Sequence, residues 1–310
     1  MLGAALAETA EAATYRVSLS AAQTVKRPFA GIDTTAEIDD QAPTLVGEVN
    51  PDRQHFVIDV GALLAPSGGD QLDIGFEMWI EDERLVVDTR DYQQLKDQNP
   101  DVQLGPFEPG IFFVDLTEFE EDSPELLAAI GGTSAPDLRE MAQKLPAALI
   151  SVEETSSDPP TFVGSMTYAD LLEAQGGDVG ASASGAAAGI ALNSAVSADV
   201  LTQFYIDFFV SVEVEVVIEL NEQGLFPVLS TRSDLSSQYR ALLDVEGFVP
   251  EMTESERHEA FEMFENAVHV LETRAVYEVD DDLKVSVPPT TADDRTDQWR
   301  QLLTAAGLGT

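Results

Sequence analysis

Alternating apolar and polar side chains between residues 72 and 89 predict a β-hairpin. Apolar side chains occupy every second position in its first half: Leu72, Ile74, Phe76, Met78 and Ile80. The positions between them are mostly acidic, and this period of two is typical of a strand with one buried face. The sequence EDER at 81–84 then predicts a turn into a second strand. The question is whether the apolar face covers a packed core or a cavity for an apolar ligand.

The same alternation recurs along the first ninety residues and predicts a meander of antiparallel strands. The segments are Ala13–Val25, Ile32–Asp40, Ala42–Asn50 and Arg53–Leu64. In the last of these, Phe56, Ile58 and Val60 share one face. The spacing of apolar residues over 2–9 indicates a short amphipathic helix before the first strand.

The middle of the chain predicts short helices joined by Pro and Gly. We expect helices at Tyr92–Gln98, Ser123–Gly132, Ala135–Leu145 and Tyr168–Gly177, and strands at Ala147–Thr155 and Thr161–Ala169. Ser123 followed by Pro124 is a favourable helix start, because Ser caps a helix and Pro suits its first position. The Ala-, Gly- and Ser-rich segment Asp178–Ala198 is either a flexible insertion or a small-residue helix packed closely against a neighbour.

The last third returns to strands. Its clearest strand is Val212–Leu220, in which Val214, Val216 and Ile218 share a face. We further expect helices at Ala198–Ser211, Thr253–Val268 and Asp294–Leu308, and strands at Leu225–Leu235, Val268–Asp282 and Leu283–Pro289. The predicted elements follow the order strands, helices, strands, without a regular βαβ alternation. This order predicts an α+β fold built on a curved antiparallel sheet.

The net charge of the chain limits which classes of molecule the protein can bind. The 310 residues include 57 Asp and Glu against 16 Lys and Arg, a formal net charge of −41. Such a chain repels phosphate backbones, so we expect no binding of nucleic acid, and anionic membrane surfaces are disfavoured for the same reason. The acidity fits either adaptation to high salt or the surface of an exported protein. The chain has no cysteine and no apolar run near the ~20 residues that span a bilayer.

Candidate catalytic and metal-binding residues are sparse. His55, His258 and His269 show no metal-ligand spacing within one predicted element. The sequence VGSMT around Ser165 lacks the second Gly of a nucleophile elbow. The acidic stretches at 117–125 and 278–284 lack the pattern of an EF-hand loop, and nothing singles out one carboxylate pair for sugar hydrolysis. The sequence therefore predicts no metal, no cofactor and no catalytic residue.

Several segments in order resemble the LolA-like carriers of lipoproteins and lipids, especially their actinobacterial LppX/LprG-type relatives. They are ALAETAEAATYRVSLSA, FEMWIEDERLVVDT, SPELLAAIGG followed by FVGSMTYADLLEA, and VEVEVVIELNEQGLFPVLS with late strands ending in VSVPP. The resemblance implies one domain over residues 1–310, with a Gly/Ala-rich insertion at about 176–198. It implies a half-open antiparallel β-barrel with helices on its concave side and a cavity for acyl chains between them.

The resemblance implies a non-enzymatic binder or transporter of lipids or acylated lipoproteins in the cell envelope. We expect a monomer, because the sequence shows no strong heptad pattern or exposed apolar stripe. The chain is longer and more acidic than such carriers, and it lacks their lipid-bearing Cys; whether a full-length precursor has a signal peptide and a lipid anchor stays open. The expected lining of the cavity is apolar: Phe56, Ile58, Val60, Ile74, Phe76, Met78, Ile80, Val214, Val216 and Ile218. Two alternatives are an extracytoplasmic scaffold with a closed core and a hydrolase with an unrecognised carboxylate pair.

Overall fold

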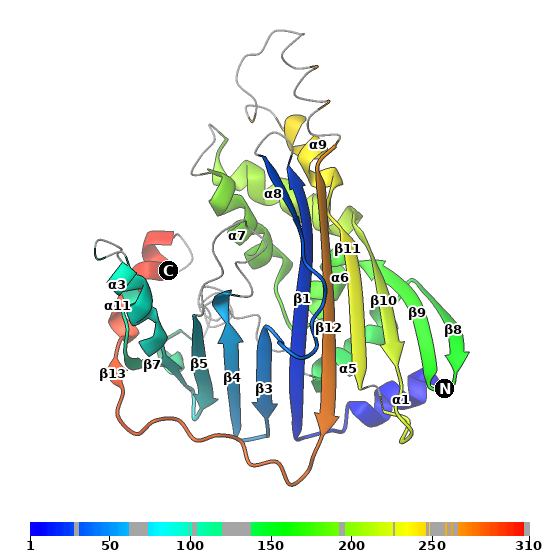
Figure 1. Ribbon diagram of the computed structural model, residues 1–310, viewed down its shortest axis with the longest axis horizontal. Coiled ribbons are helices and arrows are strands. Elements are labelled where there is room, and N and C mark those ends of the chain that lie inside the picture. Colours follow the sequence, from blue (N-terminus) through cyan, green and yellow to red (C-terminus); the bar gives the residue numbers. More distant parts are fainter. Residues whose placement is uncertain are drawn as a thin grey trace.

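The fold is known from a computed structural model. It describes residues 1–27, 31–61, 74–98, 100, 104–119, 138–191, 196–225, 227–245, 248, 258, 262 and 266–306. The described strands form one 13-stranded sheet, in the order β13-β7-β6-β5-β4-β3-β1-β12-β11-β10-β9-β8, with β2 beside β1. The two ends of this order, β8 and β13, do not pair with each other, so the sheet stays open (Figure 1).

The strands follow the predicted meander closely. Their bounds are β1 (Tyr15–Arg27), β2 (Ile32–Thr35), β3 (Leu45–Val49), β4 (Arg53–Asp59), β5 (Gly75–Glu81), β6 (Arg84–Asp88), β7 (Ile111–Asp115), β8 (Ser151–Ser157), β9 (Pro160–Thr167), β10 (Glu213–Glu219), β11 (Val228–Asp234), β12 (Val268–Val279) and β13 (Asp293–Asp294). All of the paired strands are antiparallel except β13, which runs parallel to β7.

Helices pack on the concave side of the sheet. The described α-helices are α1 (Leu2–Thr9), α3 (Gln93–Gln98), α5 (Leu138–Ala148), α6 (Tyr168–Ala174), α7 (Val179–Ala191), α8 (Ala198–Ser211), α9 (Ser237–Leu243) and α11 (Thr296–Ala306), with 3-10 turns at Arg90–Tyr92, Gly105–Phe107 and Leu116–Phe119. Helix α5 buries Leu138, Met141 and Leu145, which lie on one face at helical spacing and join the strand core. The predicted α+β fold with helices on a curved sheet is confirmed (Figure 1).

The register aligns inward-facing apolar side chains across one half of the sheet. Phe112 of β7 pairs with Val87, Val87 with Met78, and Met78 with Phe56. On the other half, Leu229 of β11 pairs with Ile218 of β10, and Ile218 pairs with Phe162 of β9. Because strand side chains alternate between faces, these rows form one apolar inner face.

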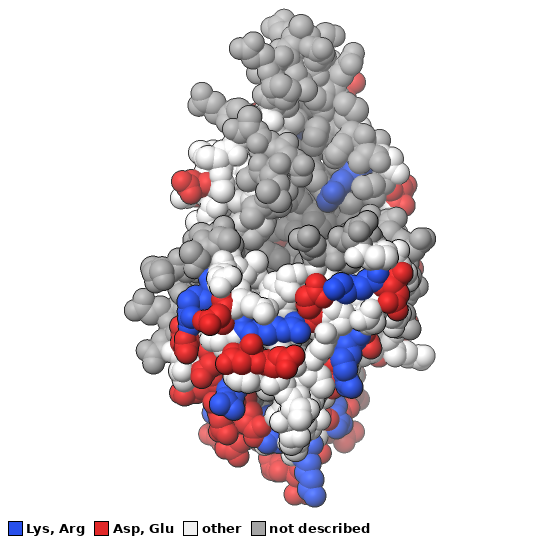
Figure 2. All heavy atoms as spheres, turned by 90° about the vertical axis from the view of Figure 1, so that its left-hand side faces the viewer, with Lys and Arg blue, Asp and Glu red and all other residues white. Residues whose placement is uncertain are grey.

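The outer face is charged. Its cross-strand ion pairs include Arg16–Glu48 at 3.2 Å, Arg274–Glu219 at 3.1 Å and Arg232–Glu272 at 3.1 Å. Figure 2, which presents the side of the molecule with β7 and β13, shows positive side chains interspersed among negative ones on its lower part. Such exposed pairs contribute little to stability, but they keep this face solvated. The apolar side chains of the sheet therefore lie mainly on its inner face.

Some predicted elements differ from the structure. The predicted strand Leu283–Pro289 is wrong: this segment has no regular structure, and Pro288 and Pro289 have no N–H to donate to a neighbouring strand. The segment crosses one end of the sheet toward β13 (Figure 1), and Ser286 N donates to Glu48. The predicted strand at Ala147 begins only at Ser151, because α5 continues to Ala148.

Other segments were missed or left open by the sequence. The chain at Ile111–Asp115 forms β7, although its alternating Phe112 and Val114 could have indicated a strand. Of the Ala/Gly-rich segment, Val179–Ala191 is helical and packs along α8. The predicted helix Ser123–Gly132 lies outside the described residues, and so does Thr253–Val268 apart from residues 258, 262 and 266–268.

Candidate functional site

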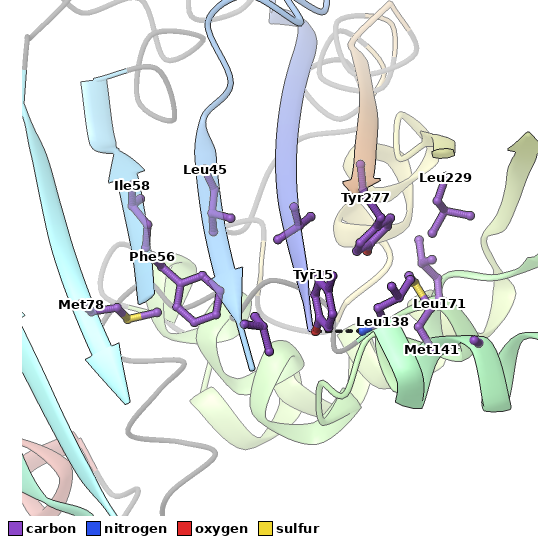
Figure 3. Packing of buried hydrophobic residues seen from close by; sticks show 14 of the residues in the cluster. Tyr15, Leu45, Phe56, Ile58, Met78, Leu138, Met141, Leu171, Leu229 and Tyr277 are labelled. Atoms are coloured by element: carbon purple, nitrogen blue, oxygen red, sulfur yellow. Dashed lines mark hydrogen bonds between the residues drawn. The ribbon is translucent and has the colours of Figure 1, made fainter. Parts of the chain in front are cut away.

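The ten residues expected to line a cavity lie together in one apolar cluster. Eight are buried, with exposed fractions from 0% for Met78 and Val214 to 5% for Phe76, and Val60 and Ile80 are partly buried against the others. Figure 3 shows Phe56, Ile58 and Met78 on the strands, and Leu138 and Met141 of α5 within the same cluster. These side chains are brought together as predicted, but as a packed core. Their contact with a ligand stays a prediction.

A hydrogen bond joins this core to the helix layer. Tyr15 Oη accepts from the backbone N of Leu138 at 3.1 Å, at the described start of α5 (Figure 3). The first N–H groups of a helix have no partner within the helix. Tyr15 therefore satisfies one of them and fixes α5 against β1 at this end of the concave side.

Farther along β1, the buried face of the strand changes. Tyr15 and Val17 are buried on the inner face, then Ser20 and Ala22 are buried on the outer face, and Val25 is again buried on the inner face. The segment between β2 and β3 covers that outer face: Ser20 Oγ donates to the backbone O of Asp39 at 3.1 Å. The inner-facing positions at this level are only partly buried. They are Leu19, Ala21 and Gln23.

Strand β12 shows the same change opposite these residues. Tyr277 and Ala275 are buried on the inner face, whereas Thr273 and Leu271 are partly exposed. The register pairs Ala21 with Thr273 and Gln23 with Leu271. We call the five partly exposed residues the open inner face: Leu19, Ala21, Gln23, Leu271 and Thr273. Solvent reaches the middle of the concave side at these positions.

A second apolar cluster lies on the helices of the concave side. Tyr205, Phe208 and Phe209 of α8 are buried with Ala183 and Ala187 of α7. The small alanine side chains allow α7 to lie close along α8. This aromatic cluster and the first core are distinct groups of buried residues, and Tyr168 packs against both.

One end of the inner face is polar. Arg27 Nε donates to Tyr239 Oη at 2.9 Å, and the guanidinium lies 5.4 Å from the centroid of that ring. Gln238 Nε2 lies 2.6 Å from Nδ1 of His269, and the rings of Tyr239 and His269 are 6.2 Å apart. Residues from β1, α9 and β12 thus meet at the end of the strands farthest from Tyr15.

Burial shifts the pKa values of Tyr205 and His269, which lie near Arg27. Burial raises the pKa of Tyr205 to about 12, with a smaller contribution from Tyr239. Burial also lowers the pKa of His269, and the positive charge of Arg27 lowers it further. Both residues are therefore uncharged at neutral pH.

Three hollows on the described surface are lined by residues other than the ten predicted to line a cavity. One of about 640 Å³ lies between β6, β7 and the segment around Pro288, and includes Arg84 and Phe113. One of about 700 Å³ lies over the strands that contain Ser151 and Glu213. One of about 350 Å³ lies between α1 and the turn after β10. None of these three is lined by the ten predicted residues.

The candidate catalytic residues have ordinary partners. His55 lies 3.1 Å from Glu77 and stacks on Trp79, with ring centroids 4.9 Å apart. The hydroxyls of Ser165 and Ser151 are 3.1 Å apart. Within the described ranges, no three His, Asp or Glu side chains are grouped to hold a metal ion. Asp88 is the buried carboxylate of the described chain, and it binds Arg90 rather than a second acid.

Comparisons with known proteins give little further information. No protein-family model matches the chain, and no curated protein matches it. Among solved structures, the crystal structure of the Mycobacterium tuberculosis lipoprotein LppX is similar over 92% of this chain and 98% of that chain, with a TM-score of 0.34 and 8% sequence identity. This similarity is too weak to support a functional conclusion. Within the described residues, no helix is both long and apolar enough to cross a membrane.

Proposed function

We propose that the protein binds lipids, or the acyl chains of lipoproteins, without catalysing a reaction. The acyl chain lies along the open inner face, and the ten predicted residues form the apolar body beside it. The observation that carries this proposal is the change of buried face along β1, which leaves Leu19, Ala21 and Gln23 accessible on the concave side. Ligand sites are mostly concave and apolar with few polar groups.

The energetics of such a site need no polar motif. Each methylene removed from water gains about 0.8 kcal/mol, so a ~16-carbon chain gains roughly 13 kcal/mol before ordering costs are subtracted. Residues such as Leu19 and Leu271 supply this contact. The lack of a catalytic or metal-binding motif in the sequence is compatible with this kind of binding.

As part of this proposal, the protein works as a monomer outside the cytoplasm, in the cell envelope. Its charge of −41 keeps it soluble and repels anionic membrane surfaces. A carrier that exchanges its ligand benefits from such repulsion, because it does not stay bound to the membrane. Acylated lipoproteins are included as ligands, since they present the same acyl chains.

Native mass spectrometry tests the proposal. The protein is purified from a lipid-containing cell, its intact mass is measured, and any ligand is extracted and analysed. We expect a discrete added mass that extracts as a phospholipid, glycolipid or fatty acid. An apo mass that persists after incubation with fluorescent fatty acids would reject the proposal.

The second candidate is an extracytoplasmic scaffold with a closed core. Complete burial of Phe56, Met78 and Val214 favours it, because these side chains contact other core residues and are not exposed to solvent. Under this function the inner-face residues serve only folding. The same measurement separates the two, since a scaffold stays free of lipid.

A further inference from the structure

The polar end of the inner face faces the same side as the apolar part. The β1–β12 register is continuous from Tyr15 opposite Val279 to Lys26 opposite Val268. The alternation of strand side chains is therefore unbroken, and Arg27 projects to the same side as Val17 and Ala21. By the same register His269, opposite Val25, also faces inward. The inner face thus changes along its length from apolar to cationic and polar.

Arg27 is held in place by a hydrogen bond to Tyr239. Its Nε donates to Tyr239 Oη at 2.9 Å, which fixes the plane of the guanidinium. In the part of the chain that the structure describes, no carboxylate lies within ion-pair distance of Arg27 and its two terminal nitrogens form no hydrogen bond. This is notable in a chain with 57 acidic and 16 basic residues. The terminal N–H groups remain available to an anionic acceptor.

His269 provides a second donor. Its Nδ1 lies 2.6 Å from Gln238 Nε2, and an amide NH₂ can only donate, so Nδ1 is the acceptor. The neutral ring then has its proton on Nε2, which has no partner among the described residues. The backbone N of His269 donates to Ser236 Oγ at 2.9 Å, and this fixes the residue at the start of β12.

We infer that Arg27 and His269 recognise the anionic oxygen group of a bound acyl lipid, a carboxylate or a phosphate. The acyl chain lies on the open inner face, with its head at these two donors. This inference rests on the proposed function and specifies its ligand. The net charge of −41 repels anions from the protein as a whole. A local cation with free donors is therefore needed for an anionic lipid to bind.

The inference is tested by comparing anionic and neutral lipids that have the same acyl chain. Palmitic acid is compared with hexadecanol, and palmitoyl lysophosphatidic acid with monopalmitoylglycerol, by calorimetric titration of the full chain below the critical micelle concentrations. We expect the wild-type protein to bind each anionic lipid about tenfold more tightly than its neutral partner, the usual effect of one charge-assisted hydrogen bond. Arg27→Gln should abolish most of this preference, whereas Arg27→Lys should retain part of it.

Arg84→Gln is the matched control. Arg84 also has no carboxylate within ion-pair distance in the described chain, but it lies on the outer face, 5.0 Å from the centroid of Phe113. This variant should keep the full preference. If R27Q does not fold, the wild-type comparison together with His269→Gln, which should reduce the preference, decides the question.

The binding results distinguish failure of the headgroup inference from failure of the proposed function. Equal wild-type binding of acid and alcohol would overturn the headgroup inference and leave the proposed function intact. No binding of any of the four lipids would reject the proposed function. Binding of inorganic phosphate alone, as tight as that of lysophosphatidic acid and equally dependent on Arg27, would indicate a site for free anions and overturn the lipid inference.

Discussion

The ring of Phe56 on β4 occupies the space in which any side chain at Gly47 on β3 would lie. The register pairs Gly47 with Phe56 on one side and with Val17 on the other. A Cβ at position 47 would lie 2.7 Å from two ring carbons of Phe56 and 2.9 Å from Cγ1 of Val17. A glycine in a strand often marks such a close approach. Here it lets the aromatic ring lie against the backbone at the centre of the core.

Replacing Gly47 by alanine should therefore destabilise the fold. The added methyl group would overlap Phe56 and Val17, which are both 0% exposed in the core, so we expect a loss of about 1–3 kcal/mol in the free energy of unfolding, the usual cost of overpacking. Urea denaturation measures it. The control is Gly185→Ala, at a position in α7 with nothing within 4 Å; it should raise stability by about 0.5–1 kcal/mol. Equal effects of the two substitutions would contradict the packing described.

The C-terminal helix is anchored by Trp299. This side chain is 0% exposed, and its ring lies 5.0 Å from Phe107 and 6.4 Å from Phe112, measured between centroids. Trp299→Ala should cost about 3–5 kcal/mol of unfolding free energy. The comparison is Val287→Ala, at a residue 67% exposed, which should change stability by less than about 0.5 kcal/mol. A small effect of W299A in urea denaturation would mean that α11 is not part of the cooperative fold.

Alkaline pH should destabilise the protein through Tyr205. Burial raises the pKa of this phenol from 10.0 to about 12. Its contribution is fully present below pH 10 and is lost as the pH rises toward 12, because the unfolded chain ionises first. Thermal melts between pH 9 and 12 should show a smaller loss of Tm for Tyr205→Phe than for the wild-type protein, after normalising each to its value at pH 9. An identical loss for both would place the alkaline sensitivity elsewhere.

Much of the fold could be predicted from periodicity. The opening hairpin is correct to its turn: Asp82 and Glu83 have positive φ angles of 50° and 59° between β5 and β6. The strand with Val214 and Val216 was equally clear. Such strands are predictable because one face is buried and the other solvated, which gives a strict period of two.

The elements that were mispredicted or missed do not show this period of two in a way that identifies a paired strand. The segment around Val285 reads as a strand because its side chains alternate, yet it bonds through Arg53 and Glu48 rather than through a ladder. The pairing of β13 with β7 joins residues about 180 positions apart, and no local pattern encodes it.

Only one part of the proposed site could be predicted from the sequence. The ten apolar residues do come together, because core positions follow from the strand pattern. The open inner face could not be found, since the exposure of Ala21 and the burial of Ala22 depend on which segments cover each side of β1. Arg27 and His269 were equally hidden, because the contacts that unite them come from three elements far apart in sequence.

Thiol labelling at two adjacent alanines tests the central claim most directly, since the native chain has no cysteine. Ala21→Cys lies on the open inner face, and Ala22→Cys, where the alanine is 1% exposed, lies on the covered outer face. The rate of maleimide labelling is measured with and without saturating palmitic acid. We predict that A21C reacts faster than A22C and that lipid slows only A21C, because the acyl chain covers that position. Unchanged labelling of A21C in a protein that has demonstrably bound lipid would show that the ligand lies elsewhere.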